Sequence, residues 1–160
     1  MFAMKILILS DSHGDTAALR QAITRENPDR VFHLGDMSRD AQRVAEEFPN
    51  LPLDAVLGNC DAYGGAEGPE ELLTTAGGAK FFLTHGHRYH VKMGTALLVR
   101  KGQSTGADVI CFGHTHRAVC KKYSGLWLVN PGTAGGAGAP ATYAVAEAKD
   151  GEVSVEIKSL

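Results

Sequence analysis

Five short apolar segments of the sequence are each followed directly by side chains that can bind metal ions. The five groups are Asp11-Ser12-His13, Asp36, Asn59-Cys60-Asp61, His85-Gly86-His87 and His114-Thr115-His116. Carboxylates and imidazoles together suit Mn, Fe, Ni, Co or Zn, and the sequence offers no matching set of thiolates. One tetrahedral ion would not use all of these groups. We therefore expect two ions about 3.5–4 Å apart that share a carboxylate, for which Asp36 is the natural candidate.

Each group also has an ordinary explanation when it is taken alone. Residues 11–13 could cap a helix, Asp36 could belong to a turn, and residues 59–61 could form an Asx turn. His114 and His116 are harder to explain in this way, because alternate residues can face the same side. The repeated occurrence of such side chains at the ends of apolar segments favours one shared site.

The predicted elements of the first half explain how these groups would meet. They are strands at 5–10, 30–35 and 53–58, separated by helices at 16–27 and 38–48. Asp15 or Thr16 can cap the first helix, and Ser38 can cap the second. This order of elements indicates parallel strands joined by right-handed crossovers. In such sheets ligands bind at the carboxyl ends of the strands, so the polar groups would converge in one crevice.

The second half is richer in hairpins. The predicted elements are a hairpin at 71–86, a helix at 91–106, a strand at 108–113, and hairpins at 118–130 and 142–157. Turn residues mark the hairpins, as at Gly77-Gly78 and Asp150-Gly151. We predict an α/β fold in which a two-sheet β-sandwich is flanked by helices (α/β/β/α), with residues 1–160 forming a single domain.

Composition narrows the class of protein. The chain has 160 residues, of which 44% are hydrophobic, as is usual for a globular protein. Its net charge of -2 gives no electrostatic reason to expect a nucleic acid as partner. No apolar run approaches the roughly 20 residues that span a bilayer, and the apolar N-terminal run lacks a signal-peptide cleavage site. We expect a cytoplasmic protein without a membrane partner.

The combined motifs resemble those of the calcineurin-like metallophosphoesterases. The matching motifs are Asp11-x-His13, Gly35-Asp36, Gly58-Asn59-x-Asp61, His85 and Gly113-His114-x-His116. The short chain, "GNCD" and "NPGT" (130–133) are most similar to the small YfcE-type phosphodiesterase branch, and the resemblance covers nearly the whole chain. It implies a metal-dependent phosphodiesterase that acts on small phosphoesters, in which a hydroxide bridging two ions attacks phosphorus. It also implies Mn as the metal and, in many members, a homo-oligomer.

The resemblance implies a role for each site residue. Metal one would be held by Asp11, His13, Asp36 and His116, and metal two by Asp36, Asn59, His85 and His114. Cys60 departs from the pattern, since many members have a histidine there that resembles a general acid or a phosphoryl contact. An ordinary thiol, with a pKa of about 8.5, replaces an imidazole poorly in either role. Our hypothesis is that His87 takes over part of this role and that Asp61 orients His13 or its own loop.

Two other functions remain open from the sequence. One is a non-catalytic scaffold on the same fold, since the retromer complex contains a relative with an eroded metal-binding pattern. The other is a mononuclear hydrolase or a metal-storage protein. All seven ligand positions carry competent side chains, which favours an enzyme. Arg39, Arg88 and Arg117 lie just beyond the motifs and could meet phosphate oxygens. His33, inside a predicted strand, is expected to be a hydrogen-bonded core residue.

Overall fold

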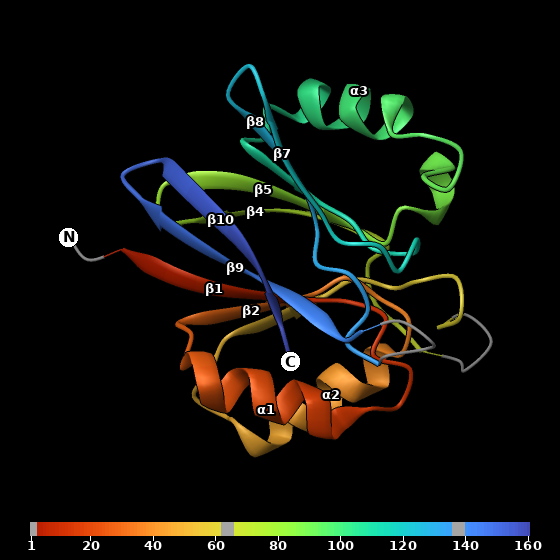
Figure 1. Ribbon diagram of the computed structural model, residues 1–160, viewed down its shortest axis with the longest axis vertical. Coiled ribbons are helices and arrows are strands. Elements are labelled where there is room, and N and C mark those ends of the chain that lie inside the picture. Colours follow the sequence, from red (N-terminus) through yellow and green to blue (C-terminus); the bar gives the residue numbers. More distant parts are fainter. Residues whose placement is uncertain (1–2, 62–65, 136–139) are drawn as a thin grey trace.

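Two five-stranded sheets packed face to face form the centre of the protein (Figure 1). The structure, a computed structural model, describes residues 3–61, 66–135 and 140–160. The first sheet has the order β10-β9-β1-β2-β3, with bounds Glu152–Ser159, Thr142–Lys149, Met4–Leu9, Arg30–His33 and Leu53–Ala55. The second has the order β4-β5-β6-β8-β7, with bounds Glu71–Ala76, Ala79–Thr84, Val109–Cys111, Leu126–Asn130 and Val119–Tyr123.

Helices cover the outer face of each sheet. The helices α1 (Thr16–Glu26) and α2 (Ser38–Glu47) lie on the first sheet, and α3 (Ala96–Thr105) lies on the second (Figure 1). Strands covered on both faces need apolar residues at successive positions, and β1 supplies them. Ile6 packs between the two sheets, whereas its neighbour Leu7 packs in the cluster that includes residues of α1 and α2. The predicted two-sheet sandwich flanked by helices is confirmed.

Parallel pairing places the carboxyl ends of the site-bearing strands together. β1 and β3 both run parallel to β2, and β6 runs parallel to both β5 and β8. Backbone hydrogen bonds continue beyond the strands: the N–H of Asp11 donates to the carbonyl of Gly35 at 2.9 Å, and the N–H of Gly113 donates to that of His85 at 2.9 Å. The loops that carry the predicted metal ligands are therefore tied to one another in pairs.

The third predicted helix begins later than its pattern suggested. Residues 91–95 lie outside α3, and a short 3-10 helix occupies His87–Tyr89. Gly94 has a φ of 145°, which is not helical, so the helical run starts only after it. Gly106 ends the helix in the left-handed region, as expected for a helix C-terminus.

Of the two predicted caps, one is confirmed and one is wrong. The side chain of Asp15 accepts a hydrogen bond from the N–H of Ala18 and caps α1. Ser38 is already the first residue of α2, and its buried Oγ has no hydrogen-bond partner among the described residues. The N–H groups of Met37 and Ser38 donate instead to the carboxylate of Asp61. A distant carboxylate thus caps this helix, which local sequence alone does not reveal.

Candidate metal centre

Six of the seven predicted ligands form two adjacent clusters at the edge of the sheets where the site-bearing parallel strands have their carboxyl ends. Asp11, His13 and His116 form one cluster, and Asp36, His85 and His114 form the other; within each, the ligand atoms lie within 4.8 Å of one another. This grouping matches the division into two ligand sets made from the sequence. The side chains come from loops that follow β1, β2, β5 and β6, so the convergence depends on the sheet topology.

Asp11 has one oxygen held by the protein and one left free for a ligand. Its Oδ2 accepts hydrogen bonds from the hydroxyl of Ser10 and the N–H of His114. Its Oδ1 is buried and has no hydrogen-bond partner among the described residues. The Nε2 atoms of His116 and His13 lie 3.1 and 3.7 Å from this oxygen. A buried carboxylate oxygen without a donor is costly, and a cation among these atoms would satisfy it.

Asp36 lies between the two clusters. Its Oδ1 accepts the N–H of Cys60 at 3.0 Å. Its Oδ2 lies 3.4 Å from Nε2 of His85 and 3.8 Å from Nε2 of His13, which belong to different predicted ligand sets. Burial raises the pKa of this carboxyl, but the neighbouring His85 and the N–H of Cys60 outweigh burial and hold the pKa well below its usual range. Asp36 is therefore ionised, as a metal ligand must be.

His85 is oriented by the backbone. Its Nδ1 lies 2.8 Å from the carbonyl oxygen of Leu34, which can only accept, so Nδ1 carries the proton. A neutral ring then has its lone pair on Nε2, which lies 3.4 Å from Oδ2 of Asp36 and 3.2 Å from Nδ1 of His114. Burial lowers the pKa of His85, but the hydrogen bond to Asp36 and the charge of Asp11 outweigh burial and raise the pKa. Burial, followed by His85 and Lys92, lowers the pKa of His114 to about 4. His114 is thus neutral near pH 7, the form in which imidazole binds metals.

Asn59 and Cys60 lie in the loop after β3, and the N–H of Cys60 contacts Asp36. The Oδ1 of Asn59 is buried and, like that of Asp11, has no hydrogen-bond partner among the described residues. The thiol of Cys60 lies at the same edge, and its partial burial and the charge of Asp36 raise its pKa. The orphaned amide oxygen fits the role of a metal ligand. The protonated thiol is even less suited to acid–base work than an ordinary cysteine.

The backbone at these positions is strained. Five predicted ligands have a left-handed φ: Asp11 (54°), His13 (46°), Asp36 (57°), His114 (71°) and His116 (60°). Non-glycine residues rarely adopt this conformation, which costs on the order of 1–3 kcal/mol at each position, and it tends to cluster at functional sites. The strain indicates that the loops are shaped to aim their side chains rather than to minimise the energy of the chain.

Two glycines let the loops approach one another closely. A Cβ on Gly58 would lie 2.2 Å from Oδ1 of Asp36, and one on Gly113 would lie 2.1 Å from Oγ of Ser10. A side chain at Gly58 would displace Asp36 itself, and one at Gly113 would displace Ser10, whose hydroxyl donates to Asp11. These glycines therefore support the site through the space they leave, in addition to any role in turning the chain.

Asp61 holds the loop of Asp36 through hydrogen bonds to backbone N–H groups. Its Oδ2 accepts the N–H groups of Asp36 and Gly58 at 3.0 and 2.7 Å, and its Oδ1 accepts those of Met37 and Ser38 at 3.0 and 2.7 Å. Of the two roles considered from the sequence, orienting the loop is the one that these contacts support. No hydrogen bond to His13 is found among the described residues.

Several supporting residues were missed by the sequence analysis. The hydroxyl of Thr133 donates to the carbonyl of Asp11, and the amide of Asn130 donates to Gly113 and Thr115. Both belong to "NPGT" (130–133), and their side chains brace the ligand-bearing loops. The tetrapeptide is visible as a motif in the sequence, but the residues that it contacts are not.

Three further residues considered in the sequence have different surroundings in the structure. His33 is buried, accepts the N–H of Gly35 and contacts the hydroxyl of Ser12, which confirms a hydrogen-bonded core residue. The ring of His87 lies 5.6 Å from that of His85, centroid to centroid, so it borders the site. Arg88 forms an ion pair with Glu70, which leaves it less available for phosphate.

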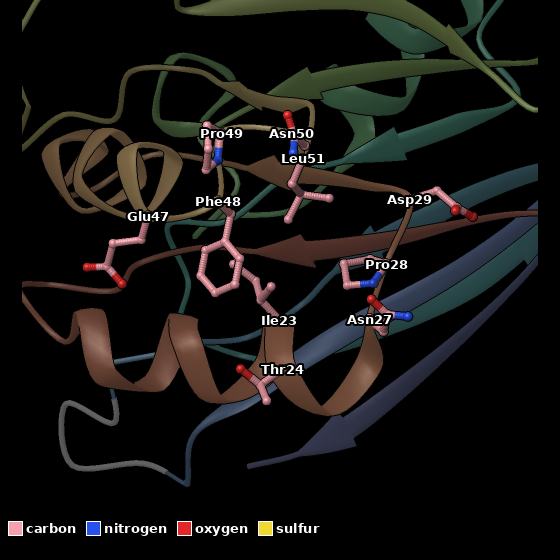
Figure 2. Close-up of a pocket in the computed structure, with 10 residues that line it drawn as sticks. All are labelled: Ile23, Thr24, Asn27, Pro28, Asp29, Glu47, Phe48, Pro49, Asn50 and Leu51. Atoms are coloured by element: carbon pink, nitrogen blue, oxygen red, sulfur yellow. The ribbon is translucent and has the colours of Figure 1, made fainter.

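A cavity of about 670 Å³ lies far from these residues, between the carboxyl ends of α1 and α2 (Figure 2). Ile23 from α1 and Phe48 from the end of α2 lie side by side in it. Both helices start near the metal-binding loops and end at the opposite edge of the sheet. None of the predicted ligands lines this cavity, so its volume does not make it the reactive site.

Known proteins match both the sequence and the fold. The profile of the calcineurin-like phosphoesterase superfamily domain matches residues 4–151. The probable metallophosphoesterase YsnB of Bacillus subtilis is 38% identical over 132 residues, covering 81% of this chain and 75% of the relative. A phosphodiesterase of Methanocaldococcus jannaschii is 30% identical over 150 residues, covering 81% of this chain and 83% of the relative.

Solved structures agree. A predicted phosphoesterase from Streptococcus pneumoniae has a TM-score of 0.82 and 29% identity, with 99% of this chain and 91% of that chain covered. Vacuolar Protein Sorting 29 from Cryptosporidium parvum has a TM-score of 0.77 at 20% identity, with 100% and 99% covered, which shows a shared fold alone. The chain belongs to the calcineurin-like metallophosphoesterases, a family that uses divalent metal ions. The resemblance found in the motifs is confirmed.

Proposed function

We propose that the protein is a dinuclear-metal phosphodiesterase. Asp11, His13, Asp36 and His116 would hold one ion, and Asp36, Asn59, His85 and His114 would hold the other. The observation that carries this proposal is the position of Asp36 Oδ2, within 4 Å of an imidazole nitrogen from each set. The orphaned oxygens of Asp11 and Asn59 support it, since each would gain a cation as partner. Mn is the metal that we propose.

When bound, two such ions would lower the pKa of a water molecule, neutralise the phosphoryl oxygens and orient the ester. The side chains of the protein prepare this chemistry. Nε2 of His85 faces Asp36 and lies 3.2 Å from Nδ1 of His114, and Asp36 is kept ionised. Asp61, Thr133 and Asn130 fix the loops, so that little reorganisation is needed when substrate binds.

Diesters are the proposed substrates because of the relatives and of Cys60. The relative from Methanocaldococcus jannaschii is named a phosphodiesterase. A phosphodiester carries one negative charge less than a monoester dianion, so it places less demand on extra cationic contacts. Cys60, with a raised thiol pKa, offers neither a cation nor a ready proton. Both points favour diesters over monoesters.

His87 is the proposed partner of the leaving oxygen. Burial and the nearby His85 lower the pKa of His87, so its ring is neutral near pH 7 and would assist by hydrogen bonding. The buried Nδ1 of His87 has no partner among the described residues. We expect His87→Ala to lower kcat for an alkyl methyl phosphate by about 10–100-fold, and by less than about threefold for a nitrophenyl methyl phosphate, which leaves without help. Steady-state kinetics on the two esters checks this; equal losses on both would contradict the assignment.

A non-catalytic scaffold is the second candidate, and the likeness to Vacuolar Protein Sorting 29 is the observation that favours it. Scaffolds of this fold do not need intact ligand sets. Here six of the seven proposed ligands lie in two close groups, and hydrogen bonds support Asp11 and Asp36, which favours an enzyme. The strained backbone and the unpaired buried oxygens of this arrangement cost stability, and an enzyme that binds metal ions explains that cost better than a scaffold does.

The deciding experiment measures hydrolysis after metals are removed and restored. The protein is stripped with a chelator and then supplied with Mn, Fe, Ni, Co or Zn singly. Each form is assayed on bis(nitrophenyl) phosphate and on nitrophenyl phosphate, and bound metal is counted by mass spectrometry. We expect diester hydrolysis with Mn, little monoester hydrolysis, and about two ions per chain. Inactivity with every metal on both esters would favour the scaffold, and one ion per active chain would favour a mononuclear hydrolase.

A further inference from the structure

A second cavity, of about 410 Å³, lies beside the candidate metal centre. This volume is within the range of roughly 300–1,000 Å³ that is usual for small-molecule pockets. The residues that line this cationic pocket are Val91, Lys92, Thr95, Phe112, Thr115, Arg117 and Val119. The first three follow the loop of His85 and His87, the next three lie in or beside the loop of His114 and His116, and Val119 begins β7. The pocket is therefore built mainly from the two second-sheet loops that carry predicted ligands.

The pocket has an unbalanced positive charge. Lys92 and Arg117 are both exposed, and in the described part of the chain no carboxylate forms an ion pair with either. No Asp or Glu is found among the described residues that line the cavity, and the first turn of α3, which begins next to Thr95, has no acidic residue. Two cations that share a cavity without a counter-charge favour an anionic ligand.

Thr115 adds a hydrogen-bond donor. Its Oγ1 accepts one hydrogen bond from the amide of Asn130 at 3.0 Å and another from the N–H of Arg117 at 3.2 Å. A hydroxyl has two acceptor sites and one donor, so only its proton is left for a ligand. The group that meets Thr115 must accept, as phosphate or carboxylate oxygens do.

The inner wall of the pocket is apolar. Val91 and Phe112 line it with side chains that are 5% and 1% exposed. A ligand that satisfies both parts of the pocket has a compact apolar or aromatic stem with an anionic end. An inorganic ion alone would leave the apolar wall unused.

The pocket also adjoins the reacting groups. Thr115 stands between His114 and His116 in the chain, and it lines the same cavity as Lys92 and Arg117. A substrate whose phosphoryl group lies at the metal centre can therefore extend one ester group over the 114–116 loop. That ester group would contact the cationic and apolar side chains of the pocket.

We propose that the cationic pocket is the leaving-group subsite, and that it selects phosphodiesters whose leaving alcohol carries a second phosphate-like anion on a compact apolar stem. This inference rests on the proposed phosphodiesterase function. In the reaction the oxygen of water bonds to phosphorus, the bond from phosphorus to the alcohol oxygen breaks, and the alcohol departs with a proton. Lys92, Arg117 and Thr115 contact the second anion and determine specificity; they do not touch the reacting phosphorus.

The test uses three methyl aryl phosphates that differ only at the para position of the leaving phenol: methyl, carboxymethyl and phosphonomethyl. The phosphonate is a phosphate analogue that is not itself hydrolysed, and the carboxylate separates phosphate recognition from general anion recognition. We expect kcat/KM for the phosphonate ester to exceed that for the neutral ester by about tenfold or more, with the carboxylate between them. In Lys92→Ala/Arg117→Ala this ratio should fall to about one.

The matched control is Arg100→Ala/Lys101→Ala. It removes the same two charges from exposed positions on α3 that do not line the pocket, and it should keep the ratio. A separate readout needs no metal: the phenol product, 4-hydroxybenzylphosphonate, is titrated into metal-free protein and followed by NMR. The amides of Lys92, Thr95 and Thr115 should shift, and the double variant should weaken binding by about fivefold or more.

The outcomes separate this inference from the function on which it rests. Hydrolysis of the neutral ester with no preference for either anion would overturn the subsite and leave the phosphodiesterase intact. A preference that survives in Lys92→Ala/Arg117→Ala would overturn it too. Equal rates for the carboxylate and phosphonate esters would overturn the selection of phosphate-like anions. If no ester is hydrolysed with any metal, the proposed function fails. If the phenol product shifts only amide signals outside the pocket, the pocket does not bind that product.

Discussion

Replacing Asp36 by asparagine should reduce turnover on a phosphodiester by about 10³-fold or more. It should also lower bound metal from about two ions per chain to one or fewer, measured by mass spectrometry on the same sample. The reason is the place of Asp36 between the clusters, with Oδ2 facing His85 and His13. A carboxylate can give a negatively charged oxygen to both ions, whereas a neutral amide of the same shape cannot.

Asp150→Asn is the matched control for this prediction. Asp150 is exposed in the turn between β9 and β10 with a φ of 52°, which asparagine adopts as readily as aspartate. The control should keep turnover, metal content and stability. Near-normal turnover in Asp36→Asn would remove the bridging assignment, and loss of turnover with two ions still bound would mean that Asp36 acts after metal binding.

The residues singled out in the sequence converge in the fold because two local signals coincide. Apolar runs reveal where strands end, and a carboxylate or imidazole at each end is visible without any knowledge of contacts. Parallel pairing of β1 with β2 and of β5 with β6 then brings these ends together by a general rule of sheets. For this reason the two clusters agree with the sets proposed from the motifs.

What the sequence did not predict depends on contacts between distant residues. Thr133 supports Asp11 across 122 positions, and Asp61 caps α2 across 23, so neither contact has a local pattern. Ser38 looked like a helix cap because serine is favoured at helix N-termini, but the carboxylate of Asp61 is the group that accepts the N–H groups at the start of α2. The cationic pocket was missed for a similar reason, since Lys92 and Arg117 share a cavity only in the folded chain.

Strain was also invisible in the sequence. The identity of Asp36 or His116 does not by itself determine a left-handed φ, since Asp15, Asp29 and His33 lack it. The conformation is imposed by the surrounding loops, which are held by hydrogen bonds from side chains elsewhere. A site built in this way should be sensitive to the residues that hold it, even where they contact no ligand.

Asp61 offers the sharpest test of that view. We expect Asp61→Ala to lower the free energy of unfolding by about 2–4 kcal/mol, because it leaves four backbone N–H groups without their acceptor. Urea denaturation followed by circular dichroism measures this. Asp29→Ala is the control, since that carboxylate accepts one backbone N–H, from Lys5, at an exposed position; its cost should be below about 1 kcal/mol.

Asp61→Asn makes the prediction more specific than simple loss of a carboxylate. Each carboxylate oxygen accepts two N–H groups: Oδ2 those of Asp36 and Gly58, and Oδ1 those of Met37 and Ser38. In either orientation the NH₂ of an asparagine faces two donors, so the isosteric change should destabilise the protein nearly as much as alanine does. Stability close to that of the unmodified protein in Asp61→Asn would mean that the loop of Asp36 is held by something other than this carboxylate, and its strained backbone would then need another cause.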